Sequence, residues 1–399
     1  MGHGKDVKYF FERTLKMDSR DLKKQLIIWR HMLHQNPETA FEEKKTAEFV
    51  AEKLKELGME VHTGIGGTGV VASLSAGDGK AVIGIRADMD AINLKELSDH
   101  DHVSKNAGKM HGCGHDGHTA TLLGAAVLLA ETKNFNGTVR FFFQPAEEPG
   151  HGAKAMMDDG LFEKYPVDEI YGLHNAPFLP AGVIHTRTGG IMASEDNFKI
   201  RITGQGGHAS SPHQGIDPLT SASQIYLALQ TIVSRNGNPL HPIVISCTEW
   251  HTDGAHNAIP THVEILGDTR SCSKEDQILI ENRMREVSQG ICTMNGAKCE
   301  FDYTHEFNPV LNDKNCVDTV IRAAIQTVGK EKVDENCEPW MASEDFAAYL
   351  NQVPGCFLLL GSGKTEENIP LHNAMFDYND EVLMTGAELW KNLVEERLK

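Results

Sequence analysis

Three short apolar runs that each end in polar residues constrain this chain more than any other feature of its sequence. They lie in KAVIGIRADMDA, TVRFFFQPAEE and DEIYGLHNAP, and helical segments such as EKKTAEFVAEKLKELG and TATLLGAAVLLAETK alternate with them. This alternation is typical of buried parallel strands in an α/β sheet. Functional residues collect beyond the carboxyl ends of such strands. We therefore expect one sheet edge to carry the polar residues after the runs: Asp88, Asp90, Glu147, Glu148 and His174.

The pattern changes near residue 194, where NFKIRITG alternates apolar and polar residues as a half-exposed strand does. Counted from this strand, the segments have the order β-α-β-β-α-β, which is typical of a ferredoxin-like domain. After residue 308 the α/β pattern returns, with a helix and the apolar strand CFLLLG. We therefore predict an α/β catalytic domain formed by residues 1–193 and 309–399, with an inserted α+β domain at 194–308. The other predicted segments are helices at about 217–235, 274–294 and 314–328, and strands PIVISCTEWH, THVEILGDTR and AKCEFDYTHEF.

Composition narrows the class of protein. The formal net charge is −18, from 38 basic and 56 acidic residues, which argues against nucleic acid and anionic membranes as partners. The eight cysteines are scattered and form no C-x-x-C pair, as expected of reduced thiols. We see no signal peptide, and no run approaches the roughly 18 apolar residues of a membrane span. These features predict a cytoplasmic enzyme or binding protein.

Metal-binding residue types gather in MHGCGHDGHT, residues 110–119, which holds three histidines, one cysteine and one aspartate. A polar loop, or histidines docked on a neighbouring element, would be the simpler interpretation. Cys113 and His115 are two residues apart, so in an extended segment both would point to one face. Further ligand candidates are Glu148, His174 and, in IPLHNAMF, His372.

Thiolate, imidazole and carboxylate together suit a divalent cation such as zinc, and histidine with carboxylate alone would also accept manganese, cobalt or nickel. The candidate ligands exceed what one tetrahedral ion needs, which favours two divalent ions with a bridging ligand. Such a pair fits hydrolysis of an unactivated amide.

The adjacent pair Glu147 and Glu148 gives a second indication. Paired glutamates usually lie on a solvated helix face, but these follow an apolar strand and Pro145, where such a face is not expected. Adjacent side chains diverge, so one carboxylate can bind metal while the other holds the attacking water. We assign Glu148 as ligand and Glu147 as general base, although the sequence alone leaves the two roles interchangeable.

The motifs RADMDA, MHGCGHDGHT, QPAEE, GLHNAP, GQGGHASSP and LHN resemble those of the M20 metallopeptidase clan. Their order and spacing resemble its amidohydrolase branch, which includes hippurate hydrolase, N-acyl-amino-acid amidohydrolases and auxin-conjugate hydrolases. RHMLHQNPETAFEEKKT resembles the opening of that branch, and the match runs from about residue 27 to 395. The resemblance implies a two-metal, exopeptidase-like catalytic domain with an inserted dimerisation domain. It also implies the metal ligands Cys113, His115, Glu148, His174 and His372.

The resemblance extends to residues outside that set. It implies that Glu147 is the base and that His208 reaches the partner subunit's site and donates to the scissile carbonyl oxygen. Asn257, in HNAIP, and Arg270, in GDTRS, resemble substrate contacts. Asp90 would orient a ligand histidine, as carboxylates commonly do. Without the resemblance, His208 would be a turn histidine and Arg270 an ordinary strand-surface arginine.

Two departures from the family pattern stand out. Pro149 follows QPAEE where the family usually has glycine, which would stiffen the next loop. The approach to the site, DHDHVSKNAGKMHG, is more polar than usual, so the pocket rim at residues 99–106 is left undefined.

The sequence thus predicts a homodimeric, two-metal amidohydrolase that cleaves N-acyl amino acids into a carboxylic acid and a free amino acid. A dipeptidase or aminopeptidase with the same ions is the alternative, differing in whether the pocket admits a free ammonium group. A zinc deaminase would need H-x-E with P-C-x-x-C, and the chain has no C-x-x-C. A metal-free binding module is disfavoured because every position of the site is filled. The sequence leaves the acyl group and the amino acid undefined.

Overall fold

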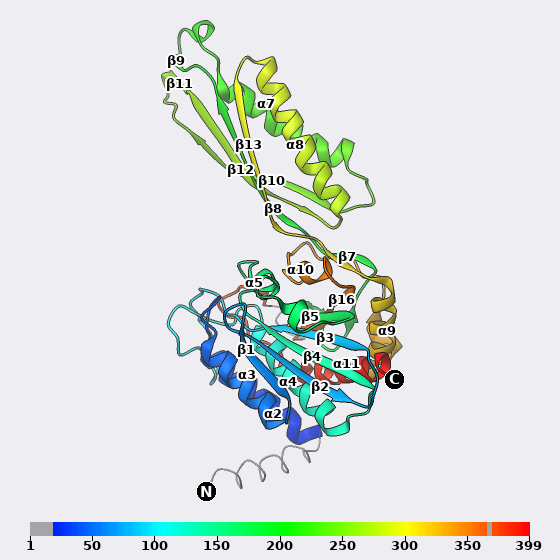
Figure 1. The fold of residues 1–399 in the computed structure, drawn as a ribbon. Helices are drawn as coiled ribbons and strands as arrows, with labels where there is room; N and C mark the ends of the chain where they lie inside the picture. The colour runs from blue at the N-terminus through cyan, green and yellow to red at the C-terminus, as the bar shows by residue number, and fades with distance from the viewer. Residues whose placement is uncertain (1–18, 365–368) are drawn as a thin grey trace. The chain divides into compact units, whose positions relative to one another are not determined.

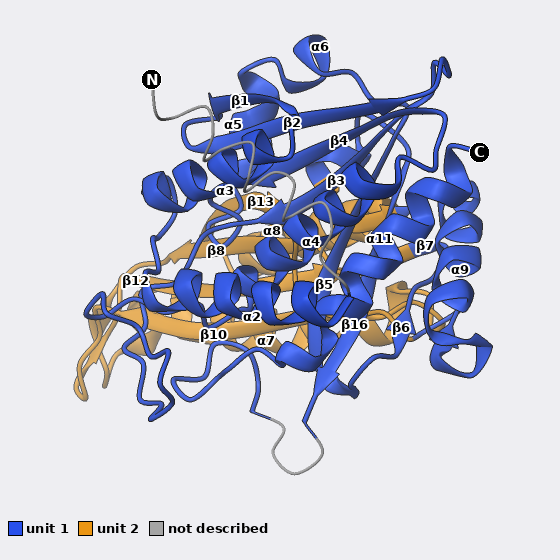
Figure 2. Cartoon of the chain, turned by 90° about the horizontal axis from the view of Figure 1, so that it is seen from below, with its two compact units in different colours: residues 1–189, 312–337, 348–399 blue, residues 190–311, 338–347 orange. Residues whose placement is uncertain are grey.

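A computed structural model describes residues 19–364 and 369–399 and divides the chain into two compact units (Figure 2). Among the described residues, the first unit comprises 19–189, 312–337, 348–364 and 369–399, and the second comprises 190–311 and 338–347. The sequence placed 338–347 in the catalytic domain. The segment joins the second unit because the backbone of Trp340 pairs with that of Ile191 and Ala193.

The first unit is built on an eight-stranded sheet with the order β1-β2-β4-β3-β5-β16-β6-β15 (Figure 1). Strands β4, β3, β5 and β16 run parallel at its centre, which confirms the predicted α/β class. The strands are β1 (Glu60–Ile65), β2 (Gly69–Ala76), β3 (Val82–Asp88), β4 (Gly137–Gln144), β5 (Glu169–Pro180), β6 (Ile184–His185), β15 (Val333–Asp334) and β16 (Gly355–Gly363).

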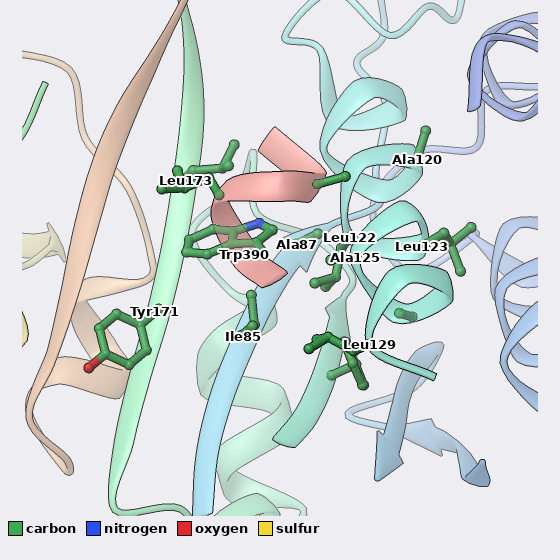
Figure 3. Packing of buried hydrophobic residues seen from close by; sticks show 14 of the residues in the cluster. Ile85, Ala87, Ala120, Leu122, Leu123, Ala125, Leu129, Tyr171, Leu173 and Trp390 are labelled. Atoms are coloured by element: carbon green, nitrogen blue, oxygen red, sulfur yellow. The ribbon is translucent and has the colours of Figure 1, made fainter. Parts of the chain in front are cut away.

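Helices of the first unit pack against this sheet, with α4 between α2 and α11, and α9 against α11. Helix α4 is apolar and buried almost throughout, whereas α3 buries one stripe and is followed by Gly58 at φ +75°. Figure 3 shows the core between α4, α11 and the sheet, including Trp390 and Leu173. The helices are α2 (Ser19–Gln35), α3 (Lys44–Glu56), α4 (His115–Thr132), α5 (Gly152–Asp158), α6 (Leu161–Lys164), α9 (Lys314–Val328), η3 (Lys330–Lys332), α10 (Ala347–Leu350), η4 (Asp380–Val382) and α11 (Leu383–Arg397).

The second unit contains a four-stranded antiparallel sheet with the order β10-β12-β8-β13, packed against α7 and α8. The order of these elements along the chain confirms the predicted β-α-β-β-α-β arrangement. Apolar residues on one face of the sheet are buried against the two helices. The elements are β8 (Glu195–Thr203), α7 (Pro218–Thr231), η2 (Ile232–Asn236), β10 (Ile243–Thr252), β12 (His262–Ser271), α8 (Lys274–Met294) and β13 (Lys298–Phe307).

Shorter elements complete the chain. They are β7 (Gly189–Met192) paired with β14 (Val310–Asn312), β9 (Gly207–His208) paired with β11 (Ala258–Ile259), and η1 (Pro212–Gln214). Within the described part of the chain, no helix has the length and apolar character needed to cross a bilayer.

Candidate metal centre

The structure brings the predicted ligands together from distant segments of the first unit. Cys113, His115 and His174 form one triplet whose ligand atoms lie within 4.8 Å of one another. Cys113, Glu148 and His372 form a second triplet that meets the same limit. Cys113 belongs to both, so the two triplets make one continuous cluster around its sulfur.

A tight turn, and not an extended segment, places Cys113 and His115 side by side. The expectation of an extended segment is wrong, because Gly114 has φ +94° and His115 already begins α4. A Cβ at Gly114 would lie 2.5 Å from Oδ1 of Asn175, so only glycine fits there. The turn brings the thiol close to the first imidazole of the helix.

His174 lies within a strand, and not beyond its end as the sequence indicated. Hydrogen bonding between β3 and β5 stops at Gly172, whereas β5 continues beside β16 to Pro180. The Nδ1 atom of His174 lies 2.8 Å from the carbonyl oxygen of Asn175. Because a carbonyl oxygen only accepts, Nδ1 carries the proton, and Nε2 presents its lone pair 3.4 Å from Cys113 Sγ.

Glu148 joins the two sides of the cluster. Its Oε2 lies 3.4 Å from His372 Nε2, and its Oε1 lies 3.9 Å from His115 Nε2. His372 has φ +60°, which is uncommon for a residue with a side chain. Its backbone N–H donates a 2.8 Å hydrogen bond to the carbonyl oxygen of Gly112. That bond fixes a C-terminal ligand beside the turn that carries the thiol.

Asp90 lies behind the cluster and contacts several of its members. His115 Nδ1 is 2.9 Å from the carbonyl oxygen of Asp90 and 3.3 Å from its Oδ1. The two carboxylate oxygens of Asp90 accept from the backbone N–H groups of Glu147 and Glu148, at 3.0 and 3.1 Å. Asp90 thus orients the imidazole of His115 so that Nε2 faces the cluster, and it also holds the glutamate pair.

The donor set fits divalent metal ions. His115 Nε2 and Glu148 Oε1 are buried and have no hydrogen-bond partner. A buried polar atom without a partner is costly, and a cation between these atoms would remove that cost. Thiolate, imidazole and carboxylate are the ligands that zinc-like ions take.

Burial and neighbouring charges control protonation in the cluster. Burial, reinforced by the Glu148 carboxylate, raises the pKa of the Cys113 thiol well above its usual value. Burial alone would lower the pKa of His115, but nearby carboxylates, that of Asp88 first, raise it to about 10. Burial lowers the pKa of His174 well below its ordinary value. Metal binding needs the thiolate of Cys113 and the neutral imidazole of His115, so bound cations would displace these protons.

His118 is a residue that the sequence interpretation missed. Its Nδ1 lies 2.7 Å from Asp88 Oδ1, and its Nε2 accepts from the backbone N–H of Asn175 at 3.0 Å. Arg86 contacts the other oxygen of Asp88 at 2.8 Å. Both nitrogens of His118 are engaged, so this residue holds Asp88 and β5 in place. The available signal was its position three residues after His115 on one helix face.

His208 and Asn257 lie together in the second unit. His208 is exposed in β9, where it pairs with Ala258 of β11. Its Nδ1 accepts from the backbone N–H of Ser210 at 3.1 Å, so Nε2 carries the ring proton and is a donor. The backbone N–H of Ala209 donates to the carbonyl oxygen of Asn257 at 3.0 Å, which keeps the two residues adjacent.

Arg270 also belongs to the second unit, in β12. Its Nε donates to Asp268 Oδ2 at 2.6 Å, and its Nη1 lies 2.9 Å from Glu195 Oε2. The guanidinium is therefore already paired with two carboxylates of its own unit.

The α/β sheet, the inserted α+β unit and a buried thiol–imidazole–carboxylate cluster together define a metal-dependent hydrolase. The chain belongs to the peptidase family M20/M25/M40, whose model matches residues 84–396. It is 40% identical over 370 residues to a hippurate hydrolase of Campylobacter jejuni, covering 93% of this chain and 96% of that protein.

Two further relatives come from Bacillus subtilis. An N-acetyl-L-cysteine deacetylase is 36% identical over 385 residues, covering 96% of this chain and 91% of that protein. The crystal structure of a dinuclear metal-binding peptidase of the M20 family superposes with a TM-score of 0.84 at 33% identity, covering 95% of this chain and 99% of that one.

Proposed function

We propose that the protein is a metal-dependent amidohydrolase that cleaves the amide bond of N-acyl amino acids, releasing a carboxylic acid and a free amino acid. The observation that carries this proposal is the buried cluster around Cys113, in which His115 Nε2 and Glu148 Oε1 have no partner. The hippurate hydrolase and the N-acetyl-L-cysteine deacetylase each match nearly the whole chain, and their names support the same class of substrate.

The proposed ligands are Cys113, His115, Glu148, His174 and His372, and they would hold two divalent ions. Cys113 is the shared ligand in this scheme, because its sulfur belongs to both triplets. Zinc or manganese fits this donor set best, and cobalt or nickel fits as well. When bound, the ions would polarise the scissile carbonyl and lower the pKa of water.

Glu147 is the proposed general base. It lies three residues after the end of β4 in a buried position, and the Asp90 carboxylate accepts from its backbone N–H. Glu147 takes the proton of the attacking water and delivers it to the leaving amine, as general acid–base catalysis requires.

His208 and Arg270 are assigned to the substrate. His208 donates from Nε2 to the scissile carbonyl oxygen, where negative charge develops. Arg270 exchanges one of its present carboxylate partners for the carboxylate of the amino-acid product, which its planar guanidinium binds through two hydrogen bonds. Asn257, adjacent to His208, contacts the substrate beside that carbonyl.

The protein is proposed to form a homodimer through its second unit. β10 is an edge strand, and apolar side chains are exposed on it and on the neighbouring α7. Leu227 is 67% exposed, and Tyr226 and Trp250 are 40% and 41% exposed with ring centroids 6.0 Å apart. An unpaired edge beside such a face suits an isologous contact with a second copy. In that dimer, His208 would serve the site of the partner subunit.

A reducing compartment such as the cytoplasm is the proposed location. None of the eight cysteines, all of which lie in the described part of the chain, forms a disulfide, and Cys113 must stay reduced to bind metal. Small molecules, and not nucleic acid or membranes, are the proposed partners, in keeping with the net charge of −18.

A substrate screen with metal-loaded enzyme tests the proposal. N-acetyl and N-benzoyl amino acids should be hydrolysed much faster than dipeptides with a free amino group, measured as kcat/KM. Faster cleavage of dipeptides would establish a dipeptidase with the same centre. No cleavage of either class would refute hydrolysis of this type of amide.

A further inference from the structure

A second group of imidazoles and carboxylates lies in the first unit, outside the five proposed ligands. Two of its members come from the unusually polar segment DHDHVSKNAGKMHG and one from just before it, and the others come from α2 and from the segment before η4. The group consists of His31, His34, Glu96, His100, His102 and Asp377.

Glu96 is the centre of one three-residue set within this group. Its Oε1 lies 3.1 Å from Nε2 of His34 and 3.1 Å from Nε2 of His100. Its Oε2 accepts from the backbone N–H of Ser104 at 2.7 Å, which turns Oε1 toward the imidazoles. The ligand atoms of the three residues lie within 4.8 Å of one another. Ligands about 2.1 Å from a tetrahedral ion stand roughly 3.4 Å apart, close to the two distances of 3.1 Å.

His34 has the support that metal-binding imidazoles have. Its Nδ1 lies 2.8 Å from Asp116 Oδ2, which directs Nε2 toward Glu96. A carboxylate behind an imidazole fixes the ring and raises its basicity as a ligand. The rings of His34 and His100 are inclined at 70°, with centroids 5.4 Å apart, so their in-plane lone pairs can meet at one point.

His100 contributes two ring nitrogens without a hydrogen bond. Both of its ring nitrogens are buried atoms that make no hydrogen bond, although Nε2 is close to Glu96. It also lines a cavity of about 270 Å³, together with Asp99 and Asp377, through which an ion could enter.

The set formed by His100, His102 and Asp377 is a poorer site. The rings of His100 and His102 are stacked 3.7 Å apart at 10°, so their lone pairs are parallel and do not converge. The Nε2 atom of His102 is already 3.0 Å from Arg30 Nη2 and 2.9 Å from Asp377 Oδ1.

We propose that His34, Glu96 and His100 bind a further divalent transition-metal ion of the zinc class, separate from the cluster around Cys113. The ion ties the loop that carries Glu96 and His100 to α2. That loop leads directly into the turn of Cys113, so the ion stabilises the approach to the hydrolytic centre. This site does not depend on the proposed function.

Zinc counting by atomic emission on the full-length protein tests the proposal. His100→Gln and Glu96→Gln should each bind one zinc ion fewer per chain than the wild type. Glu96→Gln keeps an oxygen to accept from Ser104. The matched control is His62→Gln, because His62 is a histidine 3.0 Å from a lone glutamate, Glu60, and should leave the count unchanged.

The expected difference of one ion holds whatever number the Cys113 cluster binds, so failure of the proposed function would not imitate it. An unchanged count in folded His100→Gln would overturn the site. In that case His34 would simply share a proton with Glu96 and Asp116.

Cobalt spectroscopy provides a second measurement on Cys113→Ser, in which the thiolate is absent. Equimolar Co²⁺ should give visible d–d bands without a thiolate-to-cobalt band in the near ultraviolet, and adding His100→Gln should remove those bands. Visible bands that are the same with and without His100→Gln would also overturn the proposal.

Discussion

The sulfur of Cys113 lies 3.4 Å from Nε2 of His174, whose Nδ1 is tied to a backbone carbonyl by a 2.8 Å contact. Only Nε2 of this imidazole is therefore available to bind a metal ion, and its lone pair lies on the side of the Cys113 sulfur. Because the same thiol also belongs to the triplet with Glu148 and His372, loss of this one sulfur should disturb both halves of the cluster.

Metal removal should abolish hydrolysis. Chelation should eliminate activity on N-acyl amino acids, and zinc, manganese, cobalt or nickel should restore it, because these ions suit the donor set. The measurement is the initial rate before and after dialysis, with metal content determined in parallel. Full activity in a rigorously metal-free preparation would contradict the proposed centre.

Cys113→Ala should lose both metal and activity. Cys316→Ala is the matched control, because Cys316 is equally a buried free thiol but belongs to the hydrophobic core. We expect the control to keep its metal and to lose only the modest stability that a small cavity costs, about 1 kcal/mol. Equal metal content in the two variants would show that Cys113 is not a ligand.

Substitutions of the two adjacent glutamates should affect different measured quantities, kcat for one and metal occupancy for the other. Glu147→Gln should keep its metal yet lose roughly 10²- to 10⁴-fold in kcat, because only proton transfer is removed. Glu148→Gln should lower metal occupancy, since the proposed ligand oxygens lie 3.4 and 3.9 Å from the two imidazoles. The opposite pattern would mean that the roles are exchanged.

The sequence predicted the fold class well, because the spacing of apolar residues and the length of the apolar runs distinguish helices from strands. Continuous apolar runs produced β3, β4, β5 and β16, and the predicted helix at 274–294 has the bounds of α8. Residues 338–347, which the sequence pattern placed in the catalytic domain, fall in the second unit because their backbone pairs with 191–193, and such pairing leaves no trace in composition.

The candidate site was predictable in residue type but not in local geometry. Cys113 and His115 were expected to share a face of an extended segment, whereas a left-handed Gly114 sets their direction. His118 was overlooked because its role depends on Asp88 and Asn175, which are remote in sequence and meet it only in the fold.

Gly114 itself offers a test of that geometry. Gly114→Ala adds a Cβ that would lie 2.5 Å from Asn175 Oδ1, at φ +94°. Gly182→Ala is the matched control, because φ is +79° there and nothing lies within 4 Å of the added Cβ. The control should cost about 1–2 kcal/mol from backbone strain alone. Gly114→Ala should cost about 1–3 kcal/mol more from the clash and should lower metal affinity. Equal free energies of unfolding in the two variants would refute the close contact with Asn175.

Mixing two inactive variants tests whether His208 serves the partner subunit. His208→Ala should raise the activation barrier by about 3–4 kcal/mol and so lower kcat strongly, with metal content unchanged. In a hybrid dimer with Glu147→Gln, one site would combine an intact Glu147 from one chain with an intact His208 from the other. Random exchange makes about half of the dimers hybrid, each with one complete site, so roughly a quarter of wild-type activity should return.

A His208 that acts within its own chain predicts no recovery, because every site would still lack one group. The control is a mixture of each variant with itself, which should stay inactive under the same exchange conditions. Subunit exchange can be verified by native mass spectrometry with one chain isotopically labelled. Verified exchange without recovery would refute the shared site, and the exposed face of α7 and β10 would then need another explanation than a catalytic dimer.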